Sequence, residues 1–143
     1  MAGEVVLGYD GQHGSEVALR TATQIAAAFK RPLVIVFGYS PTLMGGDVGD
    51  LRRAVRELGE QFTEKAVADV KALDPSVEVE VQLVDLRPAE AVLEVARVRD
   101  ALAIVIGATG EGPMKGALLG NVTYQVVHRS TRPVVVVPEP DED

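Results

Sequence analysis

Residues 102–121 read LAIVIGATGEGPMKGALLGN and place an apolar run directly before a glycine-rich loop. A strand is expected over Leu102–Ile106, because a short, continuously apolar run rich in β-branched residues is typical of a strand covered on both faces. The loop extends from Gly107 towards Asn121, near which the next helix begins. Five of the 14 glycines of the chain fall between Gly107 and Gly120. A strand-to-helix connection usually needs about 2–6 residues, so this loop is unusually long.

The segments on either side of this stretch predict alternating strands and helices. Four further strands are expected at Val5–Tyr9, Leu33–Phe37, Val77–Val84 and Val134–Val137. Four helices are expected: one capped by Ser15 and reaching Phe29, one over 47–73, one with Pro88 in its first turn, and one over Asn121–Ser130. In the long helix, apolar residues recur three or four apart from Val48 to Leu73, which predicts one buried face. Strict alternation of this kind predicts an α/β fold, a parallel sheet with helices on both faces.

The third strand indicates the order of the sheet. Its apolar residues alternate with Glu78, Glu80 and Gln82, and a period of two leaves one face in water, as in an edge strand. With this strand at one edge, the simplest doubly wound order is 3-2-1-4-5. The connection then reverses between the first and fourth strands, and ligands bind beyond the carboxyl ends of the strands at such a switch point. The predicted site therefore lies just after Tyr9 and just after Ile106.

The glycine-rich loop has the features of an anion site. Glycines let consecutive backbone amides turn inward around an anion, and the free N–H groups of a helix that begins near Asn121 point into the same space. Lys115 could add a charge-assisted hydrogen bond to a phosphate. A plain glycine-rich turn with ordinary capping by Asn121 is the alternative.

Asp10 follows the first strand, between Gly8 and Gly11, and faces the loop across the switch point. Its carboxylate could accept hydrogen bonds from ribose hydroxyls or from an adenine edge. The alternative is that Asp10 caps the first helix or supports a turn, but a phosphate loop opposite favours the nucleotide interpretation. His13 is expected in an exposed loop before the first helix.

Two common phosphate motifs do not fit the loop. The P-loop pattern fails because Gly112 is followed by Pro113 instead of Lys and Ser or Thr, and the dinucleotide fingerprint fails because the glycines follow the fourth strand. The spacing that fits is G-x2-G-x9-G, formed by Gly107, Gly110 and Gly120.

This spacing after a fourth strand resembles the universal stress protein family, in its ATP-binding subgroup, with a variant motif that ends in Asn121. The segments VVLGYDG, RPAEAVLEVA, LLGNVTYQVVHRS and RPVVVVP resemble the first strand, the third and fourth helices and the last strand of that family. The resemblance covers residues 1–138 as one domain and leaves 139–143 as an acidic tail. It implies a Rossmann-like fold related to the adenine nucleotide alpha hydrolases.

The resemblance also implies a nucleotide site that holds ATP, with or without Mg²⁺. The nucleoside would contact the first-strand aspartate and the end of the second strand, and the loop would hold ribose and phosphates. The nucleotide-binding residues carried over are Gly8, Tyr9, Asp10, Phe37, Gly38, Gly107, Ala108, Gly110, Lys115, Gly120, Asn121 and Val122. Two departures weaken ATP binding: Asn121 replaces a Ser or Thr and offers no hydroxyl to a metal, and Glu111 brings a carboxylate near the phosphates.

Composition excludes several classes of chemistry. The chain has no cysteine and only two histidines, His13 and His128, so disulfides, thiolate chemistry and a histidine-rich metal centre are excluded or disfavoured. No general base or water-positioning residue can be named, so at most slow ATP hydrolysis is expected. The formal charge is −7, and without four acids of the tail (Glu139, Asp141, Glu142, Asp143) it is −7 + 4 = −3. Acidity argues against binding to nucleic acid or anionic membranes. The lack of a leader-like or membrane-spanning run predicts a cytoplasmic protein.

The last strand, Val134–Val137, is an apolar run between Pro133 and Pro138. As a sheet edge it would be exposed unless it paired with the same strand of a second copy, which gives a two-fold dimer; cover by the acidic tail is the alternative. The sequence therefore predicts a stress-response dimer that binds ATP or a related adenine nucleotide. Two alternatives stay open: a family member without nucleotide binding that acts as a dimeric interaction module, and a binder of AMP or cyclic AMP.

Overall fold

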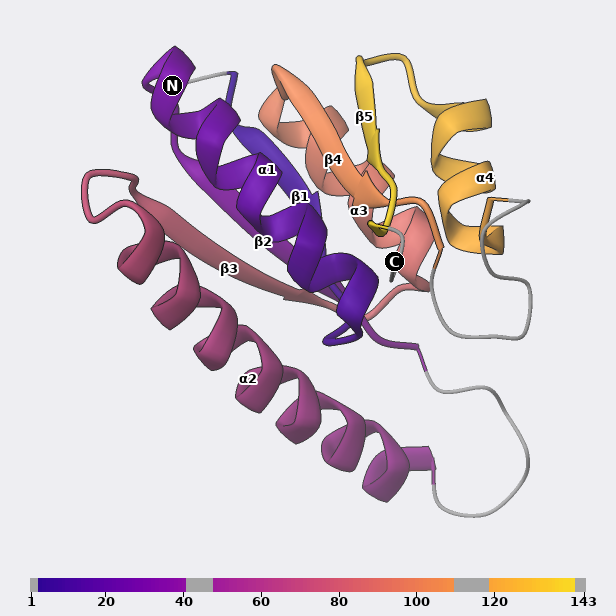
Figure 1. Cartoon of the computed structure of the whole chain (residues 1–143). Coiled ribbons are helices and arrows are strands. Elements are labelled where there is room, and N and C mark those ends of the chain that lie inside the picture. Colours follow the sequence, from indigo (N-terminus) through magenta and orange to yellow (C-terminus); the bar gives the residue numbers. More distant parts are fainter. Residues whose placement is uncertain (1–2, 41–47, 110–118, 141–143) are drawn as a thin grey trace.

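The computed structural model describes residues 3–40, 48–109 and 119–140 of the 143-residue chain. Strands and helices alternate along it (Figure 1). Their bounds are β1 Val5–Gly8, α1 His13–Phe29, β2 Leu33–Gly38, α2 Val48–Leu73, β3 Val79–Val84, α3 Pro88–Arg99, β4 Ala103–Gly107, α4 Asn121–Arg129 and β5 Val134–Val137. No helix in these ranges is both long and apolar enough to cross a membrane.

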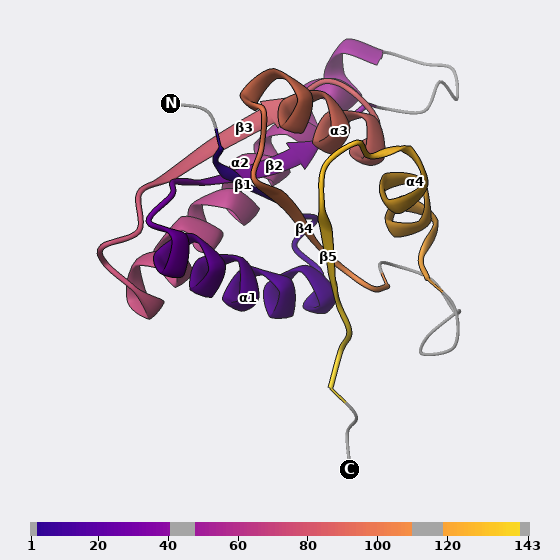
Figure 2. The same cartoon turned by 90° about the horizontal axis from the view of Figure 1, so that it is seen from above.

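The five strands form one parallel sheet in the order β3-β2-β1-β4-β5, which confirms the predicted α/β fold and strand order. Because side chains alternate along a strand, the central strands supply two cores. Leu7 packs with α1 and α2 on one face, and Val6 packs with α3 and α4 on the other. Figure 2 shows the two helical layers on either side of the sheet.

Two predicted element starts differ from the structure by two residues or more, and local hydrogen bonds explain both. Helix α1 begins at His13, with Gln12 in the N-cap position, so Ser15 is not the cap and His13 lies in the helix instead of a loop. The Ser15 hydroxyl instead donates a hydrogen bond to Oδ1 of Asp10, at 2.9 Å. Strand β3 begins at Val79, because Val77 is still in a turn in which its N–H donates to the carbonyl of Asp74 at 3.2 Å.

The predicted buried face of α2 is formed only where the helix lies over the sheet. Ala66 and Val70 are fully buried, whereas Leu51 is 44% and Leu58 45% exposed. The reason is length: 26 residues of helix span about 39 Å, and a six-residue strand spans about 20 Å. Figure 1 shows the first turns of α2 continuing past the ends of the strands.

Candidate functional site

A pocket of about 460 Å³ lies at the carboxyl ends of the strands, at the predicted switch point between β1 and β4. Most of the predicted site residues line it: Gly8, Tyr9 and Asp10 after or within β1, Phe37 and Gly38 from β2, Gly107 from β4, and Gly120, Asn121 and Val122 around the start of α4. Ala108 is not part of the wall but holds the base of the loop. Gly110 and Lys115 lie outside the described residues.

Asp10 supports the turn before α1 and also lines the pocket. Its Oδ1 accepts a hydrogen bond from the Gln12 N–H at 2.9 Å and another from the Ser15 hydroxyl at 2.9 Å. The turn-supporting role weighed from the sequence is therefore real. It leaves Oδ2 without a hydrogen-bond partner among the described residues, and the side chain is exposed. One carboxylate can thus hold the turn with one oxygen and accept a ligand hydroxyl with the other.

The start of α4 supplies backbone donors to the same pocket. Gly120 is the N-cap residue, with an extended backbone and no side-chain cap, so Asn121 is the first helical residue and not the cap. The Tyr124 N–H makes the first return bond, to the carbonyl of Gly120 at 2.8 Å. The N–H groups of Asn121, Val122 and Thr123 therefore have no partner within the helix. All three residues line the pocket, and the positive end of the helix dipole lies there too.

Three hydrogen bonds anchor this helix start to the sheet. The Gly120 N–H donates to the carbonyl of Ala108 at 2.9 Å, and the Ala108 N–H donates to the carbonyl of Val137 at 2.8 Å. The buried hydroxyl of Thr123 donates to the carbonyl of Gly107 at 2.7 Å. The base of the loop is thus tied to both β4 and β5. Sequence reasoning missed Thr123; the available signal was a hydroxyl residue three positions after the last motif glycine.

The first motif glycine is needed for close contact between backbones. A Cβ atom on Gly107 would lie 2.8 Å from the carbonyl oxygen of Gly14 in α1, and one on Gly14 would lie 2.6 Å from the carbonyl oxygen of Thr109. Real Cβ atoms essentially never approach so closely. The Glu139 carboxylate also lies at this start of α1, 3.2 Å from the Cβ position of Gly14, where the helix dipole favours a negative charge.

The other end of the pocket is apolar and includes side chains that sequence reasoning assigned to the core. Leu58 and Phe62 of α2 line the pocket, together with Val36, Pro88, Val92 and Ile106. The rings of Phe37 and Phe62 lie 6.2 Å apart, centre to centre. Helical periodicity found α2 but could not show that its projecting turns flank a pocket.

Tyr9 contributes little of its side chain to binding chemistry. Its ring is buried in the core beneath α1 and α2. Burial raises the pKa of the Tyr9 phenol above its ordinary value of 10.0, and the nearby Glu16 carboxylate raises it further. The phenol is therefore protonated at neutral pH, and Tyr9 serves the site mainly by its position in the chain.

Charge in the pocket is sparse. Asp10 is the one charged side chain on the wall that residues 3–40, 48–109 and 119–140 form. Within the same ranges, no group of three His, Asp or Glu residues is placed to hold a metal ion. The described wall can therefore hold a ligand through one carboxylate, backbone amides and apolar contact.

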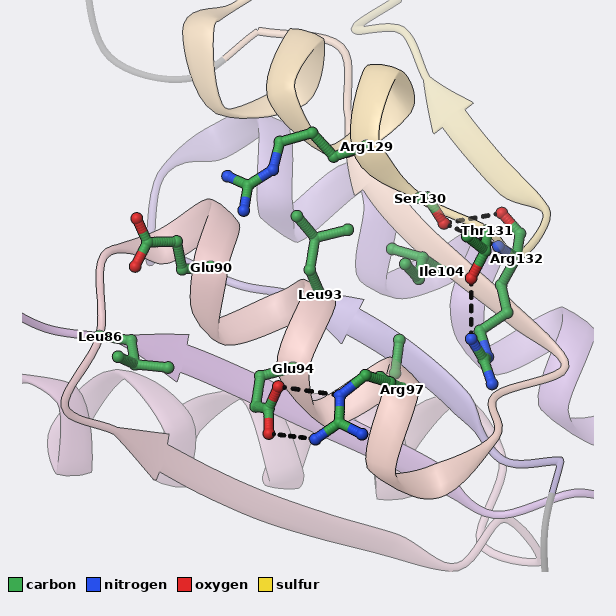
Figure 3. Close-up of a pocket in the computed structure, with 11 residues that line it drawn as sticks. Leu86, Glu90, Leu93, Glu94, Arg97, Ile104, Arg129, Ser130, Thr131 and Arg132 are labelled. Atoms are coloured by element: carbon green, nitrogen blue, oxygen red, sulfur yellow. Dashed lines mark hydrogen bonds and ion pairs between the residues drawn. The ribbon is translucent and has the colours of Figure 1, made fainter.

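A second hollow, of about 410 Å³, lies between α3 and α4 (Figure 3). Some of its polar side chains bind one another: Arg97 donates to Glu94 at 2.7 Å, and Arg132 donates to the Thr131 hydroxyl at 2.9 Å. Figure 3 shows Leu93 between Arg129 and the pair formed by Glu94 and Arg97. Arg132 Nε is buried here without a hydrogen-bond partner among the described residues. Because this hollow lies away from the switch point, it is the weaker candidate for a ligand.

The fold and the pocket define a doubly wound α/β protein with a pocket at its topological switch point. Residues 1–138 match the model of the universal stress protein family, and the chain belongs to that family. The resemblance of the motifs is thereby confirmed, while the variant that ends in Asn121 stays a prediction.

Known relatives cover the chain over most of its length. A universal stress protein of Thermus aquaticus is 31% identical over 144 residues, which cover 93% of this chain and 96% of that protein. Another, of Mycolicibacterium smegmatis, is 31% identical over 133 residues, and the chain spans only 45% of its length. The crystal structure of a universal stress protein in complex with cAMP is 28% identical, covers 98% of this chain and 100% of that one, and has a TM-score of 0.75.

Proposed function

We propose that the switch-point pocket binds an adenine nucleotide. The observation that carries the proposal is that one pocket of about 460 Å³ is lined by Asp10 and by Asn121, Val122 and Thr123, whose N–H groups have no partner among the described residues. A carboxylate accepts hydrogen bonds from hydroxyls, and a helix start binds anions. A nucleotide carries both groups. The solved complex of a related universal stress protein with cAMP supports the same ligand class.

The chemistry of the wall suggests how the nucleotide lies. The phosphate would accept hydrogen bonds from the backbone N–H groups at the start of α4. The ribose hydroxyls would donate to the free oxygen of Asp10. The base would then occupy the apolar end, near Phe37 and Gly38. The predicted contacts of Gly110 and Lys115 with the phosphates remain part of this proposal.

ATP, with or without Mg²⁺, is the proposed ligand, and AMP or cyclic AMP is the second candidate. The second is favoured by the described wall itself, where Asp10 is the one charged side chain and adds a negative charge. Each additional phosphate therefore needs a cation from elsewhere, such as Lys115 or Mg²⁺. We propose binding without rapid hydrolysis, because Asp10, the one carboxylate on the described wall, is assigned to the ribose, and the other described groups are amides, hydroxyls and apolar side chains.

Calorimetric titration with ATP, AMP and cAMP tests the proposal on the wild type, Asp10→Asn and Asp74→Asn. Asp74 is a matched control, because its Oδ1 also accepts a backbone N–H and a serine hydroxyl, both from Ser76, in a turn at the opposite end of the sheet. Asp10→Asn should weaken binding about tenfold or more, since a hydrogen bond to a charged group contributes about 1.5–3 kcal/mol. Asp74→Asn should leave it unchanged. No heat and no thermal shift with the wild type at millimolar ligand would overturn the proposal.

We further propose that two copies pair through β5, Val134–Val137, as a two-fold dimer. The Ile104 N–H donates to the carbonyl of Pro133 and the Ala108 N–H to that of Val137. Alternate residues therefore face β4, and the backbone groups of Val134 and Val136 point to the open edge. An open apolar edge of this kind supports antiparallel pairing with its own copy.

The nucleotide and the dimer would be linked through one residue. Ala108 hydrogen-bonds to Gly120 at the pocket and to Val137 at the edge strand. Any ligand that changes dimer affinity must have its own affinity changed by the same factor. A family member that works only as a dimeric interaction module would instead dimerise equally with and without nucleotide.

A further inference from the structure

We propose that Leu58 and Phe62 of α2 form the wall that holds the base of the bound nucleotide and make the pocket prefer a purine to a pyrimidine. This inference rests on the proposed nucleotide binding and names the part of the site that selects the base. The two residues lie one helical turn apart and face the same side, and both line the pocket.

Phe62 connects this wall to the proposed ribose acceptor. A Cβ atom on Gly11 would lie 2.7 Å from the Phe62 ring, and Gly11 has a φ of +81°, which favours glycine. The phenylalanine therefore packs directly on the turn that follows Asp10. Since a base is attached to its ribose, a ribose at Asp10 brings the base within reach of this helix.

Leu58 keeps apolar surface available for a ligand. Its side chain is 45% exposed although it lines the pocket. Val36, Pro88 and Val92 line the same pocket from β2 and α3. Apolar residues thus enter the pocket from α2 on one side and from the sheet and α3 on the other, an arrangement suited to a flat base with apolar faces.

Two polar contacts hold the projecting half of α2 in this position. Arg52 pairs with Asp85, at 3.0 Å, after the end of β3. Arg56 donates to the Tyr39 hydroxyl, at 2.7 Å, after the end of β2. The wall is therefore fixed relative to the strand ends from which the rest of the pocket is built.

Leu58→Ser tests the wall, and Leu51→Ser is its matched control. Leu51 lies two turns earlier on the same helix and is 44% exposed, but it does not line the pocket. Titrations use AMP and CMP, with unfolding curves to verify that each variant is folded. The wild type should bind AMP more tightly than CMP. Leu58→Ser should lower the affinity for AMP about fivefold to tenfold, because less apolar area is buried on binding. It should also reduce the preference for AMP over CMP, measured as the ratio of the two affinities. Leu51→Ser should match the wild type.

A direct contact is tested by nuclear Overhauser effects between the base protons of AMP and the Leu58 methyl groups, which we expect to observe. The proposed role of this wall is refuted if the wild type binds AMP and Leu58→Ser binds it equally well. It is also refuted if Leu51→Ser lowers the affinity for AMP as much as Leu58→Ser does. Both results leave the proposed function standing. Failure of the wild type to bind AMP, CMP, ATP or cAMP refutes the proposed function itself.

Discussion

The carbonyl oxygen of Gly14, in the first turn of α1, lies 2.8 Å from the position that a Cβ atom on Gly107 would occupy. The end of β4 and the start of α1 therefore touch through their backbones. This contact requires a glycine at the first position of the G-x2-G-x9-G motif for steric reasons, whatever the pocket binds. The first glycine of the motif is thus required by the packing of β4 against α1, and this packing shapes the site.

Gly107→Ala should lower the free energy of unfolding by about 1–3 kcal/mol, because the added methyl group meets the rigid backbone of Gly14. Urea unfolding followed by circular dichroism measures the change. Gly49→Ala, at an exposed position in the first turn of α2, is the control; it should be neutral or stabilising by up to about 1 kcal/mol. An unfolding midpoint of Gly107→Ala equal to that of the wild type would contradict the close contact.

Thr123→Val should disturb the ligand site more than its small volume change suggests. The substitution removes the buried hydrogen bond to the carbonyl of Gly107 and leaves that oxygen without this donor, at a cost of about 1–3 kcal/mol. Both the free energy of unfolding and the affinity for nucleotide should fall, because the first turn of α4 loses a hydrogen bond that anchors it to β4. Thr123→Ser keeps the hydroxyl and should restore most of both. Equal behaviour of the valine and serine variants would show that the hydrogen bond is unimportant.

Stability should depend on pH through Glu80 on β3. The Arg99 guanidinium, hydrogen-bonded to Glu80, holds the pKa of that carboxyl below its ordinary value of 4.5. In acid the unfolded chain therefore binds a proton before the folded protein does. The stabilisation is present in full above about pH 4.5 and is lost as the pH falls through the folded-state pKa. Chemical unfolding over a pH series gives the free energy of unfolding of the wild type and of Glu80→Gln. The difference between these two free energies should shrink in acid, and a difference that stays constant with pH would contradict the prediction.

The proposed dimer can be tested by placing proline at adjacent positions of β5. Val136→Pro removes an N–H that points to the open edge, so the fold should persist and dimerisation should be lost. Val135→Pro removes an N–H directed at β4, so it should destabilise the sheet itself by about 3 kcal/mol. Light scattering gives the mass, and thermal unfolding gives the stability. A dimeric Val136→Pro variant would exclude pairing through this edge.

The sequence was sufficient to predict the sheet order and the position of the pocket because both follow from alternation. The polar residues Glu78, Glu80 and Gln82 identified β3 as an edge, and the order β3-β2-β1-β4-β5 then placed the switch point beside Asp10 and Gly107. These are properties of local composition and of general rules for parallel sheets.

The features that were missed depend on specific contacts, some between near neighbours and some between residues far apart in the chain. Periodicity predicted that α2 has an apolar face, but the length of the sheet beneath it decides that Leu58 and Phe62 reach the pocket. Ser15 is a residue type that often caps helices, but its hydroxyl donates a hydrogen bond to the carboxylate of Asp10, and the helix begins earlier, at His13. Thr123 gains its role from a carbonyl group sixteen residues earlier.

The most direct test of nucleotide binding at the switch point is a titration of the ¹⁵N-labelled protein with AMP and ATP, followed through its backbone amide resonances. The central claim predicts that the amides of Asn121, Val122 and Thr123 shift with ligand concentration, together with those of Asp10 and Gly38. The amides of Thr131 and Arg132, beside the hollow between α3 and α4, should stay in place. No shift at millimolar ligand, or shifts confined to that second hollow, would contradict the claim.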